Sequence, residues 1–143
     1  MAAPTREAML EFARYYQAYW NNGDKEAWVA NWKKIAPGDF LMYDPVGTPP
    51  KKGFDNVAAN VYDLFQPFLE LNINQELMYV CGNEMCWVME NTFTKDGETS
   101  VLRSVEVFKF DEQGSVEIYT YYDVPDEQDE VKGELFATYL PGV

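Results

Sequence analysis

Carboxylates, tyrosines and lysines are the side chains that could carry acid/base chemistry in this sequence, because the chain contains no histidine. That absence excludes Ser-His and Cys-His nucleophile systems and His-ligated metal sites. The most conspicuous carboxylate is Asp44, in the stretch LMYDPVGTPPKKG at residues 41–53. It ends an apolar run and precedes a rigid loop rich in proline and glycine, a setting in which it could serve a pocket as general base. An aspartate before a proline is also a common turn residue, so a structural role is the alternative.

Two more carboxylates, Glu106 and Asp123, stand in segments with the composition of β-strands. Side chains of a strand alternate between two faces, so each carboxylate shares a face with every second neighbour. If the faces of three strands coincide, they enclose an apolar, aromatic pocket suited to a flat hydrophobic ligand with a carbonyl or hydroxyl group. The expected ligand contacts are Phe65, Trp87, Met89, Asn91, Phe108, Tyr119 and Tyr121.

The role of these carboxylates depends on which face of each strand is buried. Buried inside the pocket, Glu106 would have a raised pKa, because burial disfavours the charged form, and it could donate a proton while a more solvated carboxylate accepts one. In the opposite phase Glu106 would be a solvated edge charge, and Arg103, Val105 and Val107 would face the interior. Asp123, at the end of its strand, could instead cap the turn that follows.

The elements that must position these residues follow from the spacing of apolar side chains. Intervals of three and four predict amphipathic helices at residues 5–20, at 25–35 and after Asp55, with Thr5, Asp24 and Asp55 as N-caps. A short strand is expected at 39–43, and longer ones at 73–81, 85–94, 100–110 and 116–124. Lys51 and Lys52 are expected in a solvated loop. This order indicates one α+β domain over residues 1–143, with a curved, largely antiparallel sheet wrapped around helices on one face.

Composition narrows the choice of partners and location. The 24 acidic and 11 basic residues give a net charge of −13, which argues against nucleic acid and anionic membranes as partners. No apolar run approaches the length of a membrane span, and the first residues lack the plan of a secretion signal, so a cytoplasmic location is expected. Cys81 and Cys86 could face each other across a hairpin, although two reduced thiols are favoured in a cytosolic chain.

The chain resembles the nuclear transport factor two-like superfamily, and within it the ketosteroid isomerase and SnoaL-like polyketide cyclase branch. The resemblance spans residues 6–124. Four segments carry it: ARYY at 13–16, NGD at 22–24, YDPVG at 43–47 with the following PP and Gly53, and VEVFKFDEQG at 105–114. It implies a cone-shaped, cystatin-like fold with a mixed sheet edge and a pocket that works without a cofactor or metal.

The resemblance also implies roles for four residues. Ketosteroid isomerases use an aspartate base, a tyrosine and a protonated aspartic acid. By motif the base falls on Asp44, the tyrosine on Tyr16 and the protonated acid on Glu106, whose longer arm departs from the family pattern. Asp123 is a second departure, at a point where a carboxylate does chemistry in polyketide cyclase-like and epoxide hydrolase-like relatives.

These observations lead to one expected function and two alternatives. The expected function is a cofactor-free isomerase, cyclase or dehydratase that acts on a hydrophobic carbonyl compound, steroid- or polyketide-like. The alternatives are a non-catalytic module that binds a hydrophobic ligand or a protein, and an epoxide hydrolase-like enzyme that uses Asp123. The aromatic fraction of 16% exceeds what a monomer of this size hides easily, so a homodimer through the open sheet face is expected.

Overall fold

A computed structural model describes residues 2–122, and its elements follow the predicted order. Two helices, α1 (Arg6–Asn21) and α2 (Lys25–Ile35), precede two short strands, β1 (Phe40–Tyr43) and β2 (Lys51–Lys52). Helix α3 (Phe54–Phe65) and a single 3-10 turn (Gln66–Phe68) lead into four strands: β3 (Leu69–Cys81), β4 (Glu84–Lys95), β5 (Glu98–Phe110) and β6 (Val116–Tyr122). The predicted α+β class is confirmed.

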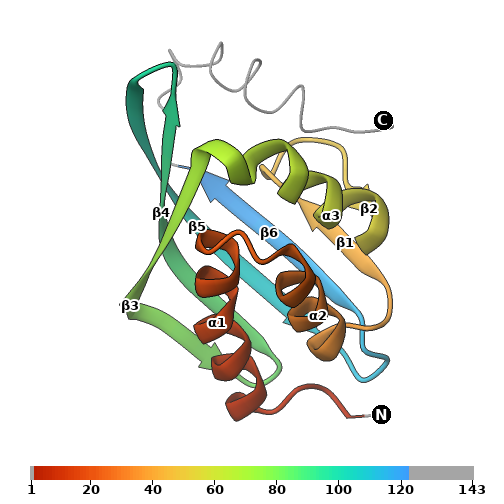
Figure 1. Ribbon diagram of the computed structural model, residues 1–143. Coiled ribbons are helices and arrows are strands. Elements are labelled where there is room, and N and C mark those ends of the chain that lie inside the picture. The colour runs from red at the N-terminus through yellow and green to blue at the C-terminus, as the bar shows by residue number, and fades with distance from the viewer. Residues whose placement is uncertain (1, 123–143) are drawn as a thin grey trace.

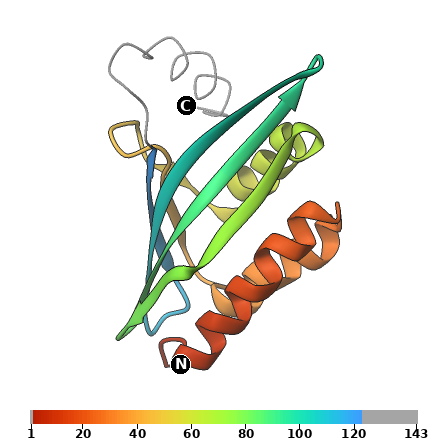
Figure 2. The same ribbon diagram turned by 90° about the vertical axis from the view of Figure 1, so that its left-hand side faces the viewer.

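The six strands form one sheet in the order β2-β1-β6-β5-β4-β3. All neighbours are antiparallel except β1 and β6, which run parallel. Figures 1 and 2 show the sheet as a curved layer with α1, α2 and α3 packed on one side; no helix of residues 2–122 lies on the other side. None of the helices in the described part of the chain combines the length and the apolar character needed to cross a membrane.

Two of the three predicted N-cap residues are confirmed, and the third prediction is wrong. The side chains of Thr5 and Asp24 cap α1 and α2, each accepting a hydrogen bond from a first-turn amide. Helix α3 instead begins after Gly53, whose positive φ of 88° suits glycine, so Asp55 lies in the first turn and is not the cap. The loop expectation for Lys51 is also wrong, because Lys51 belongs to β2 and is buried.

The core lies between the helices and the concave face of the sheet and is built from aromatic rings. Trp87 and Phe108 are completely buried, with ring centroids 4.6 Å apart. Phe12 of α1 and Trp32 of α2 meet edge to face at 4.6 Å, which locks the two helices together over the sheet. This aromatic packing fixes the distance between helices and sheet, and so limits the space left inside.

The strand pairing shows which faces of β5 and β6 are buried, a question that the sequence left open. Glu106 pairs with Trp87 on one side and Thr120 on the other, and all three are buried, so Glu106 points inward. On β6 the buried positions are Val116, Ile118 and Thr120. Tyr119 and Tyr121 therefore face away from the helices, which corrects the expectation that they share a face with Glu106.

The two cysteines lie on adjacent strands, and a separate close contact at Gly38 positions the start of β1. Cys81 pairs with Glu84 and Cys86 with Tyr79, so the thiols do not face each other, and both are free. At Gly38 the chain passes so close to the β5–β6 turn that a Cβ would lie 2.7 Å from the Gln113 carbonyl oxygen. This contact seats β1 beside β6 and thereby places Asp44 at the edge of the pocket.

Candidate functional site

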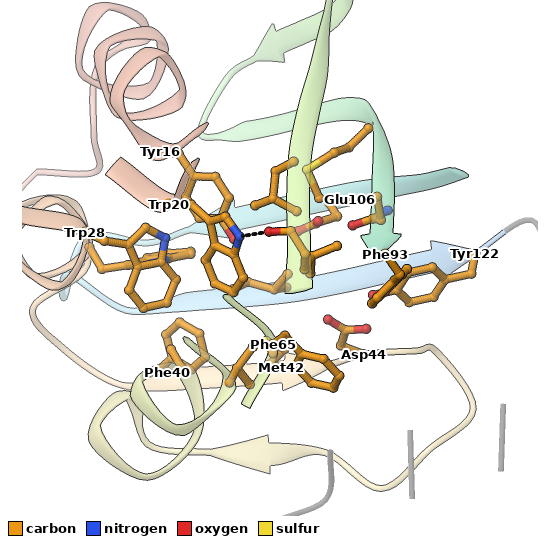
Figure 3. Close-up of a pocket in the computed structure, with 18 residues that line it drawn as sticks. Tyr16, Trp20, Trp28, Phe40, Met42, Asp44, Phe65, Phe93, Glu106 and Tyr122 are labelled. Atoms are coloured by element: carbon orange, nitrogen blue, oxygen red, sulfur yellow. Dashed lines mark hydrogen bonds between the residues drawn. The ribbon is translucent and has the colours of Figure 1, made fainter. Parts of the chain in front are cut away.

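A cavity of about 70 Å³ lies between the helices and the concave sheet face. Its wall is mainly aromatic and aliphatic, and its polar members come from five different segments (Figure 3). These polar members are Tyr16 of α1, Asp44 after β1, Asn91 of β4, Glu106 of β5 and Tyr122 of β6. An apolar pocket with a few convergent polar groups is the usual form of a small-molecule site.

Asp44 is held by the loop that follows it. The amide of Val46 donates to the Thr120 carbonyl at 2.9 Å, which ties the loop to β6. The Thr48 amide and hydroxyl both donate to the Pro45 carbonyl, at 3.2 and 2.7 Å. The ammonium group of Lys51 donates to the Asp44 carbonyl oxygen at 2.6 Å. The loop is thus fixed at three points, and Asp44 itself is only 9% exposed.

Glu106 is the most strongly perturbed carboxyl of the pocket. Burial raises its pKa to about 8, the negative charge of Asp44 adds to the increase, and the nearby indole N–H of Trp87 opposes it. Two nearly buried carboxylates in one pocket repel each other, so one of them keeps its proton near neutral pH. Glu106 is the one that does so, and it can therefore donate a hydrogen bond.

Tyr16 reaches the same space from α1. Its ring is packed between Trp28 and Trp87, at centroid distances of 6.0 and 5.2 Å. Burial raises the pKa of its hydroxyl well above the ordinary value, and the charges of Glu106 and Asp44 add to this. The phenol remains protonated at physiological pH and is available as a second donor.

Tyr122 belongs to the site but was missed in the sequence. Burial and the Asp44 charge raise the pKa of its hydroxyl, and it hydrogen-bonds to Asp44. It lies on the same face of β6 as Ile118 and Thr120, opposite Ser104 of β5. The sequence prediction placed Asp123, which lies outside the described residues, on the pocket side of this strand, and this choice turned Tyr122 away from the pocket. The alternation of the apolar residues Val116 and Ile118 instead predicts that Tyr122 faces inward.

The predicted ligand contacts divide into three groups. Phe65, Met89 and Asn91 line the cavity, whereas Trp87 and Phe108 lie in the solid core beside it. Tyr119 and Tyr121 are on the far face of the sheet. The main hydrophobic lining that the sequence did not single out consists of Trp20, Trp28, Trp32, Phe40, Met42, Leu71 and Ile118. Their helical or strand spacing marks them as buried but cannot distinguish core from cavity wall.

Two polar side chains of the lining have fixed orientations. The indole N–H of Trp20 donates to the Leu69 carbonyl at 2.8 Å, the dashed line in Figure 3. The amide nitrogen of Asn91 donates to the Leu102 carbonyl and the Ser104 hydroxyl oxygen, both at 2.9 Å. A carbonyl can only accept, so this pairing fixes which end of the Asn91 amide is the nitrogen. Its carbonyl oxygen accepts no hydrogen bond from any residue in the described part of the chain.

The arrangement provides acid/base groups and an oxyanion site. Asp44 can accept a proton, while protonated Glu106 and Tyr16 can donate hydrogen bonds to a developing negative oxygen. Within residues 2–122 no three acidic or cysteine side chains come together as metal ligands would.

The family model of the SnoaL-like domain matches residues 12–118. The chain therefore belongs to the SnoaL-like domain family, within the nuclear transport factor two-like superfamily, as the sequence resemblance predicted. No curated protein matches it.

Solved structures share the fold at low sequence identity. A candidate SnoaL-like polyketide cyclase from Jannaschia sp. CCS1 is 17% identical, with a TM-score of 0.64, and the match covers 99% of this chain and 98% of that one. RV0760c from Mycobacterium tuberculosis, solved in complex with estradiol-17beta-hemisuccinate, is 17% identical with a TM-score of 0.65, covering 82% and 95%. A computationally designed 17-OHP binder is 16% identical with a TM-score of 0.63, covering 82% and 92%. Identities this low establish the fold alone.

Replacing Glu106 with Gln should change how stability depends on pH. In the unfolded chain the carboxyl titrates near 4.5, and in the folded protein near 8. Between these values the folded state binds the extra proton, so the wild-type free energy of unfolding falls as pH rises, by on the order of 4 kcal/mol in total. Glu106→Gln should lack this decline when urea unfolding is measured at pH 5 and pH 9.

The matched control is Glu70→Gln, which neutralises an exposed carboxylate on β3. In this variant the free energy of unfolding should depend on pH as it does in the wild type. Parallel slopes for wild type and Glu106→Gln would show that Glu106 titrates normally in the folded protein.

Proposed function

We propose that this protein is a cofactor-free acid/base enzyme that moves a proton on a compact, hydrophobic carbonyl compound, as isomerases, cyclases and dehydratases do. The supporting observation is the convergence of Asp44, Glu106, Tyr16 and Tyr122 in an otherwise apolar cavity, with the pKa of Glu106 raised to about 8. Pairs of carboxyls whose proton affinities are driven apart by their surroundings are typical of acid/base active sites.

In the proposed mechanism Asp44 removes a proton from a carbon next to the substrate carbonyl. Electron density moves to the carbonyl oxygen, and Tyr16 and protonated Glu106 donate hydrogen bonds to it. The proton on Asp44 then returns to the substrate at another carbon or to oxygen, which regenerates the carboxylate. Tyr122 donates to Asp44 and orients it. Activity should fall as pH rises through about 8, because Glu106 then loses the proton it donates.

The size of the cavity restricts the substrate. An engineered protein cavity of roughly 150 Å³ binds benzene, and that volume is about twice the 70 Å³ present here. A single-ring ketone therefore requires a small displacement of the lining rings, whereas a steroid requires a much larger one. We infer a compact substrate, although two structural neighbours carry steroids in their names.

A non-catalytic binding module is the second candidate. The designed 17-OHP binder shares this fold and is a binder by its name. The epoxide hydrolase-like alternative depends on Asp123, which is outside the described residues, and no feature of the site favours it.

Asp44→Asn should abolish proton transfer and leave ligand binding intact, because the amide keeps the shape of the side chain and cannot serve as a base. The assay is isomerisation and C–H/D exchange of cyclohex-3-en-1-one in D₂O, followed by NMR. We expect a loss of at least about 100-fold, with the dissociation constant changed by less than about threefold. Wild-type activity in Asp44→Asn would remove Asp44 from the mechanism, and an inactive wild type that binds the ketone would favour the binding module.

Asn91 should select ligands that carry a hydrogen-bond donor, because its oriented carbonyl oxygen needs one and its nitrogen is already engaged. Phenol and toluene have nearly the same shape and differ in the donor. Wild type should bind phenol more tightly than toluene by on the order of fivefold, and Asn91→Leu should lose this preference in NMR titrations. Ser104→Ala, which leaves the Leu102 contact in place, should keep it; an unchanged preference in Asn91→Leu would assign the donor contact to another residue.

We also propose a homodimer formed through the face of the sheet that lies opposite α1, α2 and α3. Val105 and Tyr121 pair across β5 and β6 on that face and are 39% and 49% exposed, and Val101 adds to the apolar surface. Sedimentation should give twice the mass of one chain, and Val105→Glu should give monomers. Leu64→Glu, at an exposed position on α3, is the control and should remain dimeric. A monomeric wild type would contradict the proposal.

A further inference from the structure

Lys51 is the one basic side chain that is buried within the described part of the chain, with 2% of its surface exposed. Its neighbour Lys52 is exposed. Burying an ammonium group costs free energy unless it is paired and hydrogen-bonded. A lysine at this position therefore needs a reason that an ordinary loop residue does not.

The pairing of the two short strands explains where Lys51 points. Lys51 lies opposite Met42 on β1, and Lys52 lies opposite Leu41. Directly paired residues share a face of a sheet, and Met42 lines the cavity. Lys51 is therefore on the cavity side of the sheet edge and Lys52 on the other side.

The loop that carries Asp44 folds back onto the Lys51 ammonium. Lys51 Nζ donates to the Asp44 carbonyl oxygen at 2.6 Å and to Thr48 Oγ1 at 3.4 Å. Thr48 in turn donates to the Pro45 carbonyl at 2.7 Å. One ammonium thus connects the two ends of the 44–48 loop to the edge of the sheet.

The charges of the cavity match this geometry. Among residues 2–122, the titratable groups that interact electrostatically with Asp44 include Tyr16 of α1, Glu106 of β5, Tyr122 of β6 and Lys51 of β2. Burial lowers the pKa of Lys51, and the negative charge of Asp44 opposes that decrease. The interaction is mutual, so the ammonium also favours the charged carboxylate.

We propose that Lys51 is a positioning residue of the acid/base site, which anchors the 44–48 loop and whose positive charge keeps Asp44 ionised. Charged Asp44 then adds to the effect of burial in keeping Glu106 protonated, so Lys51 widens the difference in proton affinity between the two carboxyls. The catalytic meaning of this inference rests on the proposed function, but the coupling itself can be measured without a substrate.

The test is an NMR titration of the side-chain carboxyl carbons of Asp44 and Glu106 in the full-length chain. Lys51→Met keeps the length of the side chain and removes the charge. We expect the midpoint of Asp44 to shift upward, by about one pH unit, and that of Glu106 to shift downward, because a neutral Asp44 no longer repels it. Lys51→Arg should restore midpoints close to wild type, and Lys52→Met should not move them.

A purely structural role for Lys51 predicts a different result. Lys51→Met would then lower the melting temperature and leave both midpoints in place, which would overturn the proposal. Should Lys51→Met fail to fold, the wild type still provides a test through the Lys51 Cε resonance. That resonance should show an inflection at the pH where Asp44 titrates, and the Lys52 resonance should not; a Lys51 resonance without this inflection would also overturn the proposal.

The outcome is separable from that of the proposed function. Coupled midpoints in a protein that turns over no ketone would support Lys51 as the partner of Asp44 while removing the enzyme proposal. Turnover that depends on Asp44, together with uncoupled midpoints, would support the enzyme and remove Lys51 from its site.

Discussion

Two carboxyl groups share one largely apolar cavity in this protein, and the rest of the site follows from that constraint. Asp44 and Glu106 are both nearly buried, so bulk solvent screens their repulsion only weakly. The pair therefore settles with unequal proton affinities, the pKa of Glu106 rising to about 8. Histidine or a metal is the usual means of obtaining an acid and a base at neutral pH, and the apolar wall offers a substitute for both.

The residues that hold the fold together are largely separate from the polar residues of the cavity. The aromatic rings of α1, α2 and the central strands fill the core and keep the helices at a fixed distance from the sheet. The polar groups come from different elements: Asp44 follows the end of β1, Glu106 lies within β5, and Tyr16 lies on the buried face of α1. Because the cavity wall is separate from the core, the wall can change without disturbing the fold.

The edge of the sheet contributes more than its two short strands suggest. The two-residue strand β2 brings a lysine beside the carboxylate loop, and β1 runs parallel to β6 while the other pairings are antiparallel. This edge sets the position of Asp44 relative to Glu106, which lies on β5, the fourth strand from the edge. A charged group that holds a loop and compensates a buried carboxylate combines two tasks that are difficult to fulfil separately in so small a cavity.

The sequence by itself determined the helices, the strands apart from β2, the α+β class, and four polar members of the cavity: Tyr16, Asp44, Asn91 and Glu106. These follow from local periodicity, capping residues and segment resemblance, which neighbouring residues encode. Only the tertiary structure decided that Tyr122 faces inward while Tyr119 and Tyr121 do not, that Lys51 is buried, and that Trp87 and Phe108 fill the core beside the cavity. The physical reason is that alternation fixes the relative phase within one strand, whereas the face that becomes interior depends on which strands pair and what the helices cover. The cavity volume is likewise a small difference between the volume that the helices and sheet enclose and the volume that the side chains fill, so no local sequence pattern predicts it.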